Sequence, residues 1–150
     1  MDRRIFTAVT LFFISTFPIV AGADTVVEPE RTQGLVAPVP QAAHTLVNLQ
    51  GPGKFVSAQI TKQGGANDMT FVSLDIDGKN VVNASIAAIR NWGLTQDNPY
   101  GIVLVTSAAG LKTVTIGYPS TLTYHKNLKL SVTVQEAGVA QIIGNVVHGK

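Results

Sequence analysis

The sequence contains no cysteine among its 150 residues. This absence excludes disulfide bonds, catalysis by a thiolate, and lipid attachment to a cysteine. A chain that has no disulfide must be stabilised by its hydrophobic core or by association with other chains, and this one is long enough to bury a core.

Charged residues are also scarce. Asp, Glu, Lys and Arg together make up 13% of the chain, while apolar residues make up 45%. This composition is typical of a globular protein and excludes a disordered one. The basic residues form no cluster beyond Arg3 and Arg4. We therefore expect no nucleic-acid partner, because phosphate binding needs a concentrated positive patch.

An uncharged stretch lies near the N-terminus, where Arg3 and Arg4 precede an apolar run from Ile5 to Ala21. This run and the small residues Ala-Gly-Ala at its end predict a secretory signal peptide over residues 1–23, cleaved after Ala23. The alternative is an uncleaved membrane anchor, for which the run is short. Cleavage would leave nine basic and eight acidic residues and no stable membrane span. We expect an exported protein, periplasmic or extracellular, and the absence of cysteine favours a bacterial source.

Residues 24–43, DTVVEPERTQGLVAPVPQAA, contain three prolines and have no sustained periodicity. Such a sequence is typical of a linker, so we expect a Pro-rich flexible arm here. The alternative is that TVV or GLVAPV adds as a strand to a neighbouring subunit. The folded domain is then expected over residues 44–150.

From residue 44 onward, short segments alternate between apolar and polar residues, as half-buried strands do. Turn-forming sequences separate these segments. They predict an all-β protein, an antiparallel β-sandwich of about eight strands. The segment NASIAAIRNWG fits both a strand and a helix, and we favour a strand with a helical turn near residues 87–91. The predicted inward faces are Val56, Ala58 and Ile60; Val72, Leu74 and Ile76; and Leu128, Leu130, Val132 and Val134.

The segments IDGKNVV, IGYPSTLTYHKNLKLSVTV and AQIIGNVVHGK together resemble jelly-roll-like β-sandwich domains of phage appendage proteins and of bacterial surface and carbohydrate-binding proteins. In those domains a strand–Asp-Gly–strand hairpin is followed by a segment of the pattern P-x-x-L-x-F/Y-x-K-x-L-x-V. The resemblance covers residues 51–150 and implies a jelly-roll fold. It includes no binding motif, so it assigns no residue a role.

The stretch SLDIDGKNVV carries two acidic residues, Asp75 and Asp77. An EF-hand calcium loop beginning at Asp75 would have Lys79 at its fifth position and Ile86 at its twelfth, where oxygen ligands are needed. The pattern therefore fails. Asp77 followed by Gly78 suits the positive φ angles of a type I′ turn, and the stretch predicts a β-hairpin.

Signatures of catalysis are absent from the sequence. His44, His125 and His148 have none of the spacings at which histidines bind one metal ion. No serine lies in a Gly-x-Ser-x-Gly elbow, and GPGK lacks the spacing of a phosphate-binding loop. We therefore expect a protein that is not an enzyme and that has no cofactor or metal site.

The segment RNWGLTQDNPYG is a long polar loop that holds the only tryptophan of the chain. Loops on a rigid β scaffold often carry binding sites. Aromatic rings take the apolar face of a sugar, and amides or carboxylates take its hydroxyl groups. The alternative is that the rings anchor the loop on the sandwich. The candidate ligand-binding residues are Trp92, Gln96, Asp97, Asn98 and Tyr100.

These features predict an exported, non-catalytic binding module that recognises a glycan or another component of the cell envelope or surface. The alternative is a self-associating structural subunit of an extracellular matrix, appendage or filament, and hence a homo-oligomer. Low charge, the expected arm and the apolar segment from Val139 to Gly149 favour this alternative. The apolar segment could be a central strand or an exposed edge strand, and an exposed apolar edge promotes association.

Overall fold

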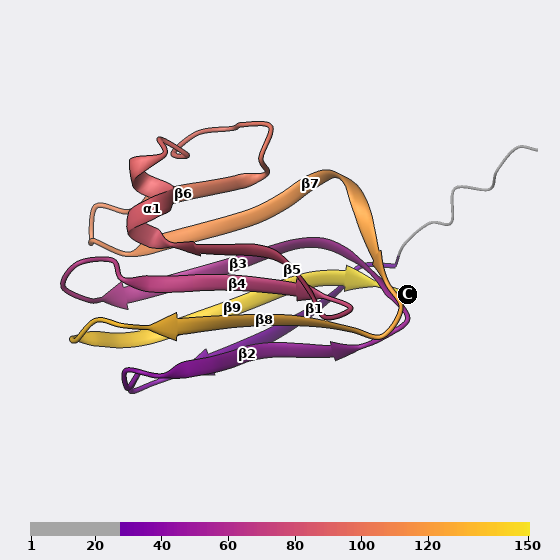
Figure 1. Cartoon of the computed structure of the whole chain (residues 1–150), viewed down its shortest axis with the longest axis horizontal. Helices are drawn as coiled ribbons and strands as arrows, with labels where there is room; N and C mark the ends of the chain where they lie inside the picture. Colours follow the sequence, from indigo (N-terminus) through magenta and orange to yellow (C-terminus); the bar gives the residue numbers. More distant parts are fainter. Residues whose placement is uncertain (1–27) are drawn as a thin grey trace, which may run out of the picture.

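The computed structural model describes residues 28–150, so the predicted signal peptide lies outside the described residues. This part of the chain forms nine β-strands and one short helix, α1 (Ile86–Asn91), and the strands build two packed sheets (Figure 1). The five-stranded sheet has, in spatial order, β1 (Glu30–Val36), β9 (Val139–Gly149), β3 (Gly53–Gly64), β7 (Lys112–Tyr124) and β6 (Ile102–Thr106). The four-stranded sheet has β2 (Ala43–Gln50), β8 (Asn127–Val134), β4 (Thr70–Ile76) and β5 (Lys79–Ser85).

The connectivity of the strands is that of a jelly roll. Strands from the two halves of the chain form nested antiparallel pairs: β1 with β9, β2 with β8, β3 with β7, and β4 with β5. The pairs β1–β9 and β3–β7 lie in the larger sheet, and the pairs β2–β8 and β4–β5 lie in the smaller one. The chain therefore crosses repeatedly between the two sheets, which is the arrangement of two Greek keys in a jelly roll. The predicted jelly-roll-like sandwich is confirmed. The ninth strand, β6, extends the edge of the larger sheet beyond the expected eight.

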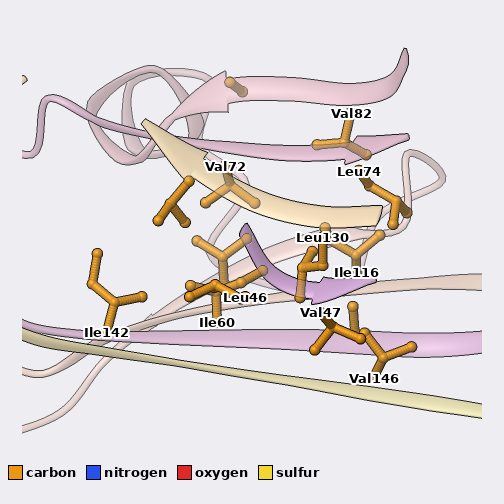
Figure 2. Packing of buried hydrophobic residues seen from close by; sticks show 14 of the residues in the cluster. Leu46, Val47, Ile60, Val72, Leu74, Val82, Ile116, Leu130, Ile142 and Val146 are labelled. Carbon is orange, nitrogen blue, oxygen red and sulfur yellow. The ribbon is translucent and has the colours of Figure 1, made fainter. Parts of the chain in front are cut away.

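The core lies between the two sheets. Period-two alternation directs one face of each strand inward, and the predicted inward residues of β4 and β8 are all buried. Burial of each such side chain contributes about 1.5–3 kcal/mol. Figure 2 shows side chains from both sheets meeting in this layer. Those labelled are Leu46, Val47, Ile60, Val72, Leu74, Val82, Ile116, Leu130, Ile142 and Val146.

The predicted inward face of β3 is wrong at Val56. The register of β3 shifts between Phe55 and Ser57 against both of its neighbours, which marks a β-bulge. Because the bulge inserts one extra residue, Phe55 is fully buried instead of Val56, while Ala58 and Ile60 face inward as predicted. Alternation in one strand does not reveal a bulge, since the bulge depends on the pairing with neighbouring strands.

The expected flexible arm over residues 24–43 is corrected for residues 30–43. Glu30–Val36 is strand β1, which pairs along its whole length with β9 of the same chain. Val39, in the connection to β2, is buried in the core. The segment GLVAPV therefore belongs to the chain's own sandwich, and residues 24–27 lie outside the described part. The prolines 38 and 40 fall in the connection between β1 and β2 and do not interrupt a strand.

Over residues 83–93 the expected strand ends at Ser85 with β5, and the helical turn expected near residues 87–91 is confirmed as helix α1 (Ile86–Asn91). The Ser85 hydroxyl caps its start by accepting a hydrogen bond from the first turn. At its end Gly93 has φ 73°, and the Leu94 amide donates to the Ile89 carbonyl over 3.2 Å, as in a Schellman motif. No helix of residues 28–150 has the length and apolar character needed to cross a membrane.

The hairpin predicted at Asp77 and Gly78 is confirmed, since both residues have positive φ, 53° and 79°, between β4 and β5. The Asp77 carboxylate accepts hydrogen bonds from the backbone amides of His125, Lys126 and Asn127, at 2.6–3.1 Å. Asp77 therefore joins the β4–β5 turn to the β7–β8 turn. The hydrogen bond from the His125 amide is the main reason that its pKa lies below the ordinary value.

Candidate functional site

The predicted loop connects α1 to β6, the edge strand of the larger sheet (Figure 1). A pocket of about 480 Å³ lies there, lined by Trp92, Leu94, Tyr100 and Ile102. Trp92 is the C-cap residue of α1, and Tyr100 lies just before β6. Trp92 is 62% exposed and Tyr100 is 68% exposed, while Leu94 is buried. We call this the aromatic pocket.

The loop is held in place by residues other than its aromatic rings. Leu94 is buried, and its carbonyl accepts a 2.7 Å hydrogen bond from the Leu104 amide of β6. The Asn98 side chain donates to the Ile102 carbonyl over 2.7 Å and accepts from the Tyr100 amide over 3.0 Å. The alternative role of Trp92 and Tyr100 as anchors of the loop does not fit their exposure. Both rings are available to a ligand.

The other three candidate residues lie elsewhere on the loop. Asp97 and Asn98 line a neighbouring hollow of about 250 Å³ on the outer face of the larger sheet. Gln96 is exposed on the loop, and its carbonyl accepts a hydrogen bond from Asn98 over 2.9 Å. The structure thus brings Trp92 and Tyr100 together and separates them from Asp97. Within residues 28–150 the lining of the aromatic pocket is Trp92, Leu94, Tyr100 and Ile102, all uncharged, so it suits an uncharged ligand with an apolar face.

A buried charge cluster lies at the same end of the sandwich, and sequence reasoning missed it. Lys62 of β3 is inside the sandwich, with its ammonium 3.0 Å from the Asp68 carboxylate and 2.5 Å from the Glu136 carboxylate. These three side chains are at most 2% exposed. Asp68 also pairs with Arg90 at 2.7 Å and with Lys112 at 2.5 Å. The sequence did contain a signal for this burial. Lys62 is separated from the inward-facing Ala58 and Ile60 by an even number of positions, so it belongs to the same face of β3.

The two carboxylates of the cluster have hydrogen-bond partners besides their cations. Glu136 accepts from the Thr70 hydroxyl at 2.6 Å and from the amides of Asn67 and Asp68, both at 3.0 Å. Gly65 has φ 97°, and a β carbon there would lie 2.5 Å from the Glu136 carboxylate, so any larger residue would be strained and would disturb the cluster. These bonds join β3, the β3–β4 loop, the β8–β9 turn, α1 and β7 at one end of the molecule (Figure 1). The arrangement indicates a structural ionic lock.

The ionic lock should make stability fall at acid pH. Burial alone would raise the pKa of Asp68 and of Glu136, but hydrogen bonds and charges from Lys62, and from Lys112 at Asp68, outweigh it. Both pKa values therefore lie below their ordinary 3.8 and 4.5. A lowered pKa stabilises the fold above the ordinary value, and this contribution is lost as pH falls through the folded-state value. We expect the free energy of unfolding, measured by urea titration, to start falling near pH 4.5 and to continue falling below pH 3.8.

The Asp77→Asn variant is the control for this acid dependence, because Asp77 also has a lowered pKa but belongs to a different pair of turns. As the pH falls, the free energy of unfolding of this variant should decrease almost as much as that of the wild type. A free energy of unfolding that is flat from pH 6 to pH 3 would contradict the ionic lock.

Among residues 28–150, no group of three or more His, Cys, Asp or Glu side chains is placed to hold a metal ion. Comparisons with protein-family models and with curated proteins give no match for this chain.

Proposed function

We propose that this protein is an exported, non-catalytic module that binds a neutral glycan of the cell envelope or surface. The observation that supports this proposal is the pair of exposed rings, Trp92 and Tyr100, which both line one apolar pocket. Large exposed aromatic side chains are unfavourable in water and are enriched at binding hot spots. A sugar presents an apolar face to such rings and hydroxyl groups to its surroundings.

The support around the aromatic pocket favours tight binding of a rigid ligand. Trp92 is fixed at the capped end of α1, and Tyr100 is fixed through Asn98. Because the loop is already ordered, binding loses little conformational entropy. The absence of a charged residue from the pocket lining disfavours acidic sugars and phosphates as ligands.

The alternative of a self-associating structural subunit has weaker support. It rests on the low charge, on the N-terminal arm and on the apolar segment from Val139 to Gly149. The arm forms β1 and the apolar segment forms β9, which lies between β1 and β3 inside one sheet. β9 is therefore paired on both sides within the chain, and β1, the edge strand, is paired with β9 on one side. Light scattering on the mature protein tests the alternative, for which a stable oligomer is expected.

We expect Trp92→Ala to weaken glycan binding at least about 30-fold, the effect of losing about 2 kcal/mol at a hot spot. Affinity electrophoresis in gels that contain neutral polysaccharides identifies the bound polymer, and calorimetry measures the affinity. Tyr100→Ala should weaken binding in the same direction. The conservative Trp92→Phe should retain part of the affinity, because it keeps an aromatic face.

Val105→Ala is the matched control for these variants. Val105 is also an exposed apolar residue of this edge, at 52% exposure, but it does not line the aromatic pocket. Its truncation should leave binding unchanged. Wild-type binding that survives Trp92→Ala and Tyr100→Ala would place the site elsewhere.

A further inference from the structure

The outer face of the larger sheet has two hollows that meet at one residue, Thr115 of β7. The first, about 200 Å³, lies toward β1, and the second is the hollow of about 250 Å³ beside the loop. The register places Gln59, Thr115 and Val103 opposite one another on β3, β7 and β6. The two hollows therefore adjoin at Thr115 along a line that runs across the strands, and we refer to them together as the groove. The side chains lining the first hollow include Arg31, Ser57, Gln59, Thr115, Asn145 and Val147.

The groove ends beside the candidate loop. Asp97, Asn98 and Gly101 line its far hollow, while Tyr100 of the same loop lines the aromatic pocket. Five neighbouring strands span about 19 Å at the usual spacing. The groove is therefore long enough for several linked sugar units before the aromatic pocket is reached.

The chemistry of the groove fits a hydroxyl-rich, uncharged polymer. Between Arg31 at one end and Asp97 at the other, the polar lining consists of hydroxyl and amide side chains. A nucleic acid would need several cations for its phosphates. An extended peptide would need unpaired backbone groups, as at a sheet edge, but the backbones of the inner strands β9, β3 and β7 are paired on both sides.

One atom in the groove lacks a partner within the described chain. The side-chain oxygen of Asn145 is buried and accepts no hydrogen bond. An unpaired buried acceptor is destabilising, and buried polar groups are almost always satisfied. Asn145 lines the first hollow, so a sugar hydroxyl could donate to this oxygen once the side chain turns it toward the ligand. In the second hollow, Gly117 of β7 has no side chain, which keeps the floor of the groove open.

We propose that this groove binds a linear neutral polysaccharide, whose chain runs from Arg31 to the loop and places its next unit in the aromatic pocket. The inference rests on the proposed function and adds a ligand class: a polymer bound along its length, not a terminal sugar. Affinity should therefore rise with the number of linked sugars until the groove is filled.

Gly117→Val tests the groove, because a β carbon there would make only an ordinary contact, 3.9 Å from the β carbon of Ser57. The probes are β-glucan, α-glucan, galactan and mannan, followed by oligosaccharides of two to eight units from whichever polymer binds. Trp92 is the only tryptophan, so its fluorescence reports occupancy of the aromatic pocket. We expect Gly117→Val to weaken binding of the longest oligosaccharide by about tenfold or more, and to leave the disaccharide unaffected.

Two further variants make the result decisive. Ser131→Val introduces the same side chain on the outer face of the other sheet and should change nothing. Gln59→Ala, which truncates an exposed residue of the groove, should weaken the long ligand even if Gly117→Val folds poorly. Affinity that is independent of chain length and of both groove variants, but is lost in Trp92→Ala, would overturn the groove and retain the proposed function. No binding to any of the four polymers would overturn both.

Discussion

The Lys62→Met variant should lose about 3–5 kcal/mol of stability, the usual effect of removing one partner from a buried ion pair. Met has a similar length and packs well in an apolar interior. The loss of stability therefore reports the removal of the charge and not a change in side-chain volume. Without Lys62, Glu136 has no cation within the described contacts, although its carboxylate remains at the centre of the β3–β4 and β8–β9 connections. Asp68 would still pair with Arg90 and Lys112. We therefore expect the substitution to destabilise the surroundings of Glu136 more than those of Asp68.

Urea denaturation measures this loss, which corresponds to a midpoint shift of about 2 M for a typical dependence on urea. Lys129→Met is the matched control, since Lys129 lies on a strand and pairs with Asp75 at 4.0 Å on the solvent-exposed face. An exposed pair contributes only about 0–1 kcal/mol. Equal losses for the two variants would show that the buried cluster contributes no more than a surface pair.

Gly34→Ala should destabilise the protein by about 3 kcal/mol or more, at or above the upper end of ordinary overpacking. A β carbon at Gly34 would lie 1.8 Å from the carbonyl oxygen of Leu46 and 2.5 Å from its carbonyl carbon. These are backbone atoms of β2, which cannot turn aside as a side chain can. Gly34 pairs with Gly144 of β9, where a β carbon would also contact Leu46. Glycine on both strands therefore allows β2 to pack against the β1–β9 pair.

The expected result is a lower urea midpoint together with faster hydrogen exchange across β1, because the strand must move away from β2. Gly117→Ala is the control, since its β carbon would meet no close atom and its strand position suits a side chain. That substitution should be neutral or slightly stabilising. If Gly34→Ala resembled Gly117→Ala, the close packing of β1 against β2 would be contradicted.

The candidate site could be predicted only in part. Trp92 and Tyr100 stood out in the sequence because they are aromatic residues in a polar loop on a β scaffold. Their approach to each other depends on Leu94 and Asn98, which hold the loop through contacts with β6. The groove could not be predicted, because its residues come from strands that are distant in the sequence and adjacent only in the sheet.

The sequence by itself determined the features that depend on neighbouring residues. Alternation on β4 and β8 set their buried faces, and Asp77 followed by Gly78 set a turn, because each depends on backbone geometry within a few residues. The caps of α1, Ser85 and Gly93, were also readable locally, although the strand was preferred. These local signals sufficed for an all-β sandwich.

Only the tertiary structure decided the features that depend on distant pairs. The pairing of β1 with β9 turned an expected arm into a strand, and the register of β3 against β7 and β9 placed the bulge at Phe55. Lys62 could be buried because Glu136, 74 residues away, lies 2.5 Å from it in the folded chain. Burial of a charge is favourable only with such a partner, and a sequence does not show which distant residues will meet.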